Sequence, residues 1–175
     1  MSAFANLTGE KVRLRPFRAE DITDVYLGWL NDPVVTRFSN QRFRRHTRSS
    51  GEAYLASFAG SPNLFVSIRT IGEDRAIGTM TAYLAPHHGT CDVGIMVGER
   101  EFWGGGFGQE AWNLLTDWLI CEGDVRKLTA GCLAPNVGMV RLMERSGMHR
   151  EAVRVGQELI DGEPEDIVLY ARFAD

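Results

Sequence analysis

Residues 91–119 read CDVGIMVGEREFWGGGFGQEAWNLLTDWL, and this stretch joins a strand pattern to a helix pattern through a glycine-rich loop. Apolar residues alternate over Cys91–Val97, which is typical of a strand. After the loop, apolar residues recur at i, i+3, i+4, i+7 and i+8, the face of an amphipathic helix: Ala111, Leu114, Leu115, Trp118 and Leu119. The loop itself contains Gly104, Gly105, Gly106 and Gly108.

These glycines predict an anion site. A helix N-terminus presents N–H groups without intrahelical partners, together with the positive end of the helix dipole. Glycine allows the backbone to turn these groups toward a ligand and to approach it closely, because it has no Cβ. A plain strand-to-helix turn is the alternative interpretation.

Two common phosphate-binding motifs do not fit this loop. A P-loop needs a lysine and a hydroxyl after its last glycine, and neither Gly104 nor Gly108 is followed by them at the required spacing. A dinucleotide fingerprint that starts at Gly104 would need glycine in place of Gln109. We therefore expect neither nucleotide hydrolysis nor dinucleotide binding.

The composition indicates one globular domain, residues 1–175, with 44% hydrophobic and 24% charged residues. A formal net charge of −4 argues against nucleic acid or an anionic membrane as partner. Cys91, Cys121 and Cys132 form no C-x-x-C pair, which favours reduced, buried thiols. Without an export signal or an apolar stretch of about 18 residues, we expect a soluble cytoplasmic protein, monomeric or homodimeric.

Periodicity elsewhere predicts further strands and helices. The strands are Lys11–Phe17, Leu64–Ile71, Ala76–Leu84, Cys91–Val97, Lys127–Leu133, Met148–Gln157 and Ile167–Phe173. The helices are 22–30, 47–59, the segment after the glycine loop, and a segment from the N-cap Asn136 to Gly147. Short connections favour antiparallel neighbours. The expected fold is α/β (α+β), with a mixed, mostly antiparallel sheet of about seven strands and about four flanking helices.

The chain resembles the GNAT superfamily of acyl-CoA-dependent N-acyltransferases over 12–173, in element order and in motifs. The family signature, Gln or Arg followed by x-x-Gly-x-Gly/Ala, lies over Trp103–Gly108. Gly106 and Gly108 keep its two small positions, and Trp103 replaces the usual glutamine or arginine. Asn136 and Gly147–Met148, at the two ends of the next helix, match further family features.

Within this superfamily, short segments look like the branch of the ribosomal-protein N-terminal acetyltransferases, which also includes many amino-sugar acetyltransferases. They are Leu14–Phe17, Glu20–Asp21, Trp29–Pro33 and Phe102–Gly104. The resemblance implies transfer of an acetyl group from acetyl-CoA to a primary amine by direct attack, without a metal. An amino sugar or similar small metabolite is the favoured acceptor, and a protein N-terminus is the alternative. A catalytically silent acyl-CoA-binding domain is the alternative of another class.

The resemblance also implies how acetyl-CoA is held. Pantetheine is expected between the splayed strands 91–97 and 127–133, paired with the backbone of Ile95, Met96 and Val97. A bulge is expected at Gly94. The expected diphosphate site consists of Trp103, Gly104, Gly105, Gly106, Phe107, Gly108 and Gln109. Asn136 would contact pantetheine or the leaving sulfur.

The transfer needs an oxyanion donor and a base. The N–H of Met96 is the expected donor. An α-amine with a pKa near ~8 costs about 1.4 kcal/mol to neutralise at pH 7, and a lysine near ~10.4 costs roughly 4 to 5 kcal/mol, so a modest base suffices only for the former. Asp92 is the first candidate base, directly or through water, and a solvated or capping carboxylate is the alternative.

Other candidate groups surround this strand. His87 and His88 could contact the acceptor or act at neutral pH, or serve only as turn residues. The tyrosine that many family members use as general acid corresponds to Met143, so the thiolate leaves without a side-chain acid or Tyr83 assists. Cys91 lies on the buried side of its strand, and no acyl-cysteine is expected.

An arginine cluster surrounds Phe38 and Phe43, in the segment where the family places acceptor-binding loops. Its members are Arg37, Arg42, Arg44, Arg45 and Arg48. Such a cluster could bind a nucleotide-sugar diphosphate or an acidic peptide, with a solvated basic surface as the alternative. The histidines show no zinc-ligand spacing with the cysteines, so no metal is expected.

Overall fold

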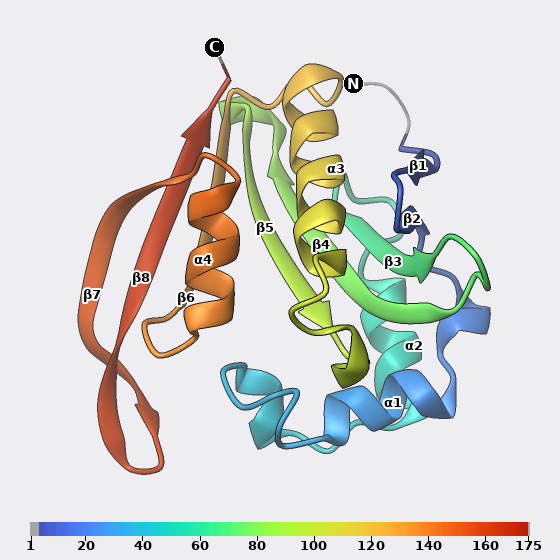
Figure 1. The fold of residues 1–175 in the computed structure, drawn as a ribbon, viewed down its shortest axis with the longest axis horizontal. Helices are drawn as coiled ribbons and strands as arrows, with labels where there is room; N and C mark the ends of the chain where they lie inside the picture. The colour runs from blue at the N-terminus through green and yellow to red at the C-terminus, as the bar shows by residue number, and fades with distance from the viewer. Residues whose placement is uncertain (1–3, 175) are drawn as a thin grey trace.

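The computed structural model describes residues 4–174, and in this part of the chain eight strands form one sheet in the order β1-β2-β3-β4-β5-β6-β8-β7 (Figure 1). The strands are β1 (Leu7–Thr8), β2 (Val12–Pro16), β3 (Leu64–Thr70), β4 (Ala76–Ala85), β5 (Thr90–Val97), β6 (Lys127–Leu133), β7 (His149–Ile160) and β8 (Glu163–Phe173). Neighbours are antiparallel except β5 and β6, which are parallel. The mixed, mostly antiparallel sheet is confirmed. The expected seven strands are one too few, because the two-residue β1 is too short to leave a periodic pattern.

Helices cover both faces of the sheet. Over the described residues they are α1 (Asp24–Asn31), α2 (Arg48–Ala56), α3 (Phe107–Cys121) and α4 (Val137–Arg145), with short 3-10 turns η1 (Ala19–Asp21), η2 (Asn40–Phe43), η3 (Pro86–His88) and η4 (Arg100–Phe102). α3 and α4 pack on one face and form the larger core, whereas α1 and α2 pack on the other face around a smaller aromatic core (Figure 1). The prediction of about four flanking helices is confirmed.

The helix α3 forms where the periodicity predicts it. Ala111, Leu115 and Leu119 have no exposed surface, and Trp112 is equally buried beside them. Burying one leucine side chain contributes roughly 1.5–3 kcal/mol relative to leaving it exposed, so this stripe fixes α3 to the sheet. The N-terminus of α3 is thereby held at the end of β5.

The largest boundary errors fall in the C-terminal hairpin. β7 and β8 extend beyond the predicted ranges 148–157 and 167–173, and their register shifts between Arg150 and Ala152 and between Arg154 and Glu158. Most of β7 is exposed to solvent, so its outer half carries no apolar alternation. The hairpin therefore projects beyond the core.

The sheet divides between β5 and β6. Their register contains only three pairs, and the last of them joins Asp92 to Thr129. Beyond this pair β5 stays with β4 as far as Val97, whereas β6 stays with β8 as far as Leu133. The two parallel strands diverge toward the end of the sheet where the glycine loop lies (Figure 1).

The expected bulge at Gly94 is wrong. β4 and β5 keep one continuous register through the pair of Thr81 with Gly94. A Cβ at Gly94 would lie 3.0 Å from Thr81 Oγ1, which is closer than ordinary contact. Glycine at this position therefore permits a close approach of a neighbouring side chain in a regular ladder.

Candidate active site

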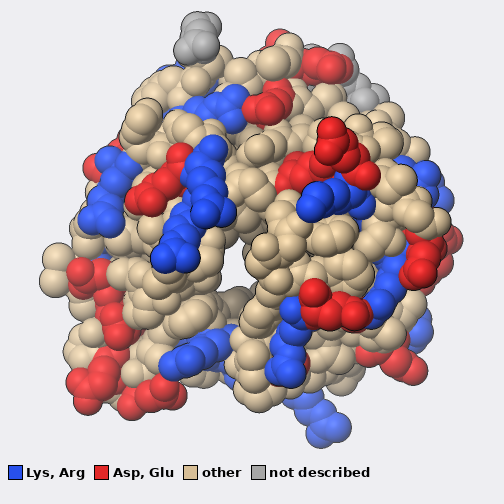
Figure 2. Space-filling view, viewed as in Figure 1, with Lys and Arg blue, Asp and Glu red and all other residues tan. Residues whose placement is uncertain are grey.

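The divergence of β5 and β6 leaves an opening through the molecule. Figure 2, in the same view as Figure 1, shows this opening between α4 and the carboxyl end of β5. At the far end the opening is bounded by contacts between η2 and the β7–β8 hairpin. Asn40 Nδ2 donates to Glu158 Oε1 at 3.1 Å, and an Arg42 guanidinium nitrogen donates to Leu159 O at 3.1 Å. A passage enclosed on all sides by the protein therefore connects the two faces of the sheet.

Backbone groups of β5 face this passage. Gly98 N–H donates to Ile77 O at 2.9 Å, and successive N–H groups of an antiparallel strand alternate between its neighbour and the opposite side. The N–H of Met96, two residues earlier, therefore faces β4. Those of Ile95 and Val97 face the passage, beyond the last pair with β6. The N–H of Met96, the expected oxyanion donor, is thus directed at β4, whereas the N–H of Ile95 is directed into the passage.

Two glycines of the loop adopt the left-handed conformation. Gly104 has φ +73° and Gly106 has φ +84°, a region that favours glycine. The first helical bond of α3 runs from Glu110 N to Gly106 O, and no side chain caps the helix start. The three preceding N–H groups, 107–109, are therefore available to a ligand. An anion at this position would accept bonds from the main chain alone.

Close packing also requires glycine at the helix start. A Cβ at Gly108 would lie 3.2 Å from Val97 Cγ2, and the nearest atoms beyond it belong to Ile95 and Leu142. Gly108 therefore allows α3 to approach β5 and α4 together. The side chain of Gln109 binds Ser146 Oγ at 2.8 Å, so it holds α3 to α4 and only its backbone faces the candidate ligand.

Trp103 closes the end of β5. Its indole Nε1 donates to Val97 O at 2.8 Å, while 46% of the residue remains exposed. This bond occupies the C=O of Val97, a backbone acceptor of the sheet edge that is expected to pair with pantetheine. The backbone available for that pairing is therefore the N–H and C=O of Ile95 and the N–H of Val97.

Asn136 and Gly147 bound α4 as predicted. Asn136 Oδ1 accepts from Met139 N–H at 3.2 Å, which makes Asn136 the N-cap, and Gly147 has φ +75° beyond the helix end. The NH2 group of Asn136 is the part of the side chain that this bond leaves for a ligand. Met143 has no exposed surface, so the position of the family's tyrosine belongs to the core.

A polar cluster lies on the face of β5 opposite to the buried side chains of Cys91 and Val93. Asp92 Oδ2 accepts from Thr129 Oγ1 at 2.8 Å, and Tyr83 is the register partner of Asp92 on β4. Tyr83 Oη lies 2.7 Å from Tyr54 Oη of α2. These four side chains, from three strands and one helix, sit where β5 and β6 begin to diverge. Sequence reasoning missed Thr129 and Tyr54, because only the folded sheet brings them to Asp92 and Tyr83.

The surroundings of Asp92 shift its pKa. Asp92 is exposed to solvent, yet partial desolvation by the atoms packed around its carboxyl group raises the pKa of Asp92, and the hydrogen bond from Thr129 opposes the rise. A raised pKa makes a carboxylate a better proton acceptor. Burial raises the pKa of Tyr54, and the bond with Tyr83 raises it further, so this phenol stays protonated at neutral pH.

The cysteines differ in their surroundings. Cys91 is 1% exposed, and burial followed by the charge of Asp92 raises its pKa to about 12. Burial raises the pKa of Cys132 to about 11. Both are thiols at neutral pH and poor nucleophiles. Cys121, at the end of α3, is exposed, so the prediction of buried thiols is wrong for this residue.

Not all predicted acceptor residues reach the passage. His87 and His88 lie in η3, before the paired start of β5, and Arg126 Nε donates to His88 O at 2.8 Å. This places them at the closed end, away from the glycine loop, so direct contact with the acceptor is not supported. Arg37, Arg44, Arg45 and Arg48 are exposed around η2, and Arg42 binds the hairpin.

The Trp29–Pro33 segment contacts both the β5–α3 connection and the segment before α2. Trp29 Nε1 donates to Glu99 Oε1 at 2.9 Å, in the connection between β5 and α3. Asn31 Nδ2 donates to His46 O and Asn31 Oδ1 accepts from His46 N–H, each at 2.9 Å. α1 is therefore bonded both to the connection between β5 and α3 and to the segment before α2. Sequence reasoning missed Glu99, because it lies 70 residues from its tryptophan partner.

Two further properties concern residues 4–174. Within this range no group of three or more His, Cys, Asp or Glu side chains is placed to hold a metal ion. No helix in the same range has the length and apolar character needed to cross a membrane.

Comparison with known proteins agrees with this geometry. A family model described as "Acetyltransferase (GNAT) domain" matches residues 11–149. The curated relative "Probable N-acetyltransferase YjcK" of Bacillus subtilis (strain 168) is 29% identical over 173 residues, which is 94% of this chain and 95% of the relative.

Two solved structures show the same fold. Ribosomal-protein-S5-alanine acetyltransferase from Vibrio fischeri has a TM-score of 0.80 at 16% identity, over 98% of each chain. Spermidine N-acetyltransferase from Vibrio cholerae, solved with CoA and spermine, has a TM-score of 0.82 at 17% identity, over 93% of this chain and 95% of that chain. Since the family model spans most of the sequence, this protein belongs to the GNAT acetyltransferase family.

Proposed function

We propose that this enzyme transfers the acetyl group of acetyl-CoA to a primary amine of a small anionic metabolite, such as a phosphorylated amino sugar. The observation that carries the coenzyme assignment is the divergence of β5 and β6 toward an uncapped helix start. A thioester on a long amide-containing arm fits between the strands, and a diphosphate fits the main-chain N–H groups 107–109. The complex of a fold relative with CoA supports this choice.

The residues of the passage divide the chemistry between them. The main chain of Ile95 pairs with pantetheine. The N–H of Ile95 or the N–H of Val97 stabilises the oxyanion of the tetrahedral intermediate. Asp92 accepts the proton of the attacking amine, directly or through one water. The thiolate leaves without a phenolic acid from α4, because Met143 occupies that position in the core.

The acceptor class follows from charge around η2. Segment 32–48 carries five arginines and a single carboxylate, Asp32. Four of the arginines are exposed: Arg37, Arg44, Arg45 and Arg48. Such a segment repels a polyamine cation and attracts a phosphate or carboxylate. The spermine in the relative from Vibrio cholerae is therefore not the favoured model for this acceptor.

A protein N-terminus is the second candidate acceptor. It is supported by the fold likeness to the acetyltransferase of ribosomal protein S5, and an acidic N-terminal peptide would suit the same arginines. Its α-amine has a pKa near ~8, within reach of a modest base such as Asp92. A catalytically silent acyl-CoA-binding domain would bind CoA but release no thiol with any amine.

The experiment is an amine screen with purified protein and acetyl-CoA. Thiol release and product mass are measured with phosphorylated and nucleotide-linked amino sugars, acidic N-terminal peptides and spermidine. Acetylation of an anionic amino sugar supports the proposal. Preference for peptides would support the second candidate, and preference for spermidine would contradict the role of the arginines.

A further inference from the structure

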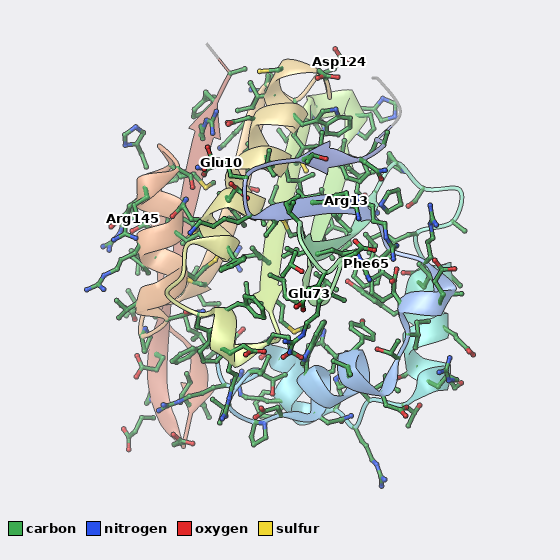
Figure 3. The ribbon with its side chains drawn as sticks, turned by 45° about the vertical axis from the view of Figure 1, so that its right-hand side comes forward. Glu10, Arg13, Phe65, Glu73, Asp124 and Arg145 are labelled. Carbon is green, nitrogen blue, oxygen red and sulfur yellow. The ribbon has the colours of Figure 1, made fainter. Side chains whose placement is uncertain are left out.

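The turn between β1 and β2 lies against the start of α3 and is bonded to it by an acidic side chain. The carboxylate of Glu110 accepts from three successive main-chain N–H groups: Glu10 at 3.0 Å, Lys11 at 2.8 Å and Val12 at 2.7 Å. Figure 3 labels Glu10 and shows this turn beside α3. A Cβ at Gly9 would lie 2.7 Å from Glu110 Cδ, so this approach requires glycine in the turn.

A second contact runs in the other direction, from the turn to the glycine loop. Lys11 Nζ donates to Gly105 O at 2.9 Å and lies 5.4 Å from the centre of the Phe107 ring. The described peptide bonds are all trans, so the C=O of Gly105 and the N–H of Gly106 point in opposite directions. The bond from Lys11 to Gly105 O therefore directs Gly106 N–H away from the Lys11 ammonium.

The side chain of Glu110 places a negative charge in the first turn of α3. A carboxylate in the first turn of α3 would repel a diphosphate if it faced the ligand. Three main-chain N–H donors hold the Glu110 carboxylate on the turn. The arrangement keeps the negative group out of the anion site while using it to fix the loop.

We propose that Lys11 and Glu110 are positioning residues that hold the glycine loop in its ligand-binding conformation before the coenzyme arrives. This inference rests on the proposed use of acetyl-CoA. Four glycines within five residues have large conformational freedom, and ordering them on binding would reduce affinity. The main chain of Lys11 is bonded to Glu110 at the start of α3, and its side chain is bonded to Gly105 O in the loop. Together these bonds restrict the loop in the free protein. The loop is thereby ready to receive the diphosphate.

The test combines hydrogen exchange with calorimetry on the full-length protein. Lys11→Met keeps a long side chain over Phe107 but removes the donor. We expect faster amide exchange at 104–109 in the free protein and a CoA dissociation constant raised roughly tenfold, the effect of one lost hydrogen bond to a charged group. Gly9→Ala displaces Glu110 from the turn. It is therefore expected to produce the same two changes, faster exchange and weaker CoA binding, through Glu110 instead of Lys11.

Lys127→Met is the matched control. Lys127 pairs with Glu151 and lies 5.3 Å from the centre of the Phe173 ring, so it resembles Lys11 in its contacts but belongs to β6. This variant should leave both the loop exchange and the CoA affinity unchanged.

Three outcomes are distinguishable. Unchanged CoA affinity and exchange in Lys11→Met and in Gly9→Ala would overturn the positioning role. Weakened CoA binding with unchanged exchange would identify Lys11 as a direct phosphate contact and would also overturn it. Absence of CoA binding by the wild-type protein would contradict the proposed function itself, while faster exchange at 104–109 in the variants would still show that Lys11 and Glu110 order the loop.

Discussion

The indole of Trp29 lies directly against Gly98, and a Cβ on Gly98 would come within 2.1 Å of the ring. This contact connects α1 to the segment that leads from β5 into the glycine loop. The bond from Trp29 Nε1 to Glu99 Oε1 at 2.9 Å lies beside it. The position of the glycine loop therefore depends on the docking of α1.

Gly98→Ala is expected to displace Trp29 and to destabilise the protein. Overpacking of this kind costs about 1–3 kcal/mol of unfolding free energy, and the shifted segment should also weaken CoA binding. Urea denaturation and calorimetry measure the two effects. Gly28→Ala in α1 is the control, because a Cβ there meets no atom within 4 Å and alanine favours helix. Equal stability of the two variants would show that the contact is adaptable.

The salt bridge of Asp21 should be important for stability. Its side chain is 5% exposed, and its two oxygens accept from both terminal nitrogens of Arg15, at 2.8 and 2.6 Å. Asp21→Asn removes the counter-charge of a guanidinium whose side chain is only 14% exposed, and we expect a loss of about 3 kcal/mol. The exposed carboxylate of Glu20 serves as control, since Glu20→Gln should change stability by less than ~0.5 kcal/mol. Similar urea midpoints for the two variants would refute the argument.

Asp92 should determine the acid limb of the pH profile. As base it must be ionised, so kcat/KM falls as pH drops through its pKa, which burial raises above the usual aspartate value of about 3.9. Asp92→Asn should remove this limb and lower the rate roughly 100-fold or more. Thr129→Val removes the bond that lowers the pKa, so the limb should move to higher pH. A limb that is identical in all three proteins would exclude Asp92.

Gly106→Asp should abolish binding of CoA. Gly106 has φ +84°, and a Cβ there would lie 3.7 Å from Lys11 Nζ, so the new carboxylate would add a negative charge beside the start of α3 and compete for the ammonium that bonds Gly105 O. Gly60→Asp controls for backbone strain, because Gly60 has φ +70° and open space around it. Calorimetry should record a loss of roughly 100-fold or more for the first variant alone. Retained affinity in Gly106→Asp would mean that the diphosphate binds elsewhere.

The exposed arginines should affect only charged acceptors. The double replacement of Arg44 and Arg45 by alanine should raise KM for a phosphorylated amine about tenfold. The replacement removes charge-assisted hydrogen bonds from the guanidinium groups to the phosphate. The same amine without its phosphate is the control, and its KM should not change. An unchanged KM for both acceptors would favour a merely solvated basic surface.

Local chemistry made much of the fold predictable. The stripe from Ala111 to Leu119 and the glycines before it define α3 and its start, because spacing and backbone freedom are properties of neighbouring residues. The N-cap Asn136 was predictable for the same reason. The two-residue β1 and the outer half of the exposed hairpin were not, since neither carries an apolar period.

The candidate site was predictable only in part. Asp92 was identified from its strand, but its partner Thr129 lies 37 residues away and is brought close by the parallel pairing of β5 and β6. The direction of the Met96 N–H depends on register with β4, which a single strand pattern does not contain. Lys11 and Glu110 gave no motif, because their contact joins segments about 100 residues apart.

A crystal structure of the protein with CoA tests the central claim most directly. We predict that the diphosphate lies within hydrogen-bond distance of main-chain N–H groups 107–109 and that pantetheine pairs with Ile95 between β5 and β6. An unoccupied passage at saturating CoA, or a diphosphate bound away from the start of α3, would contradict it.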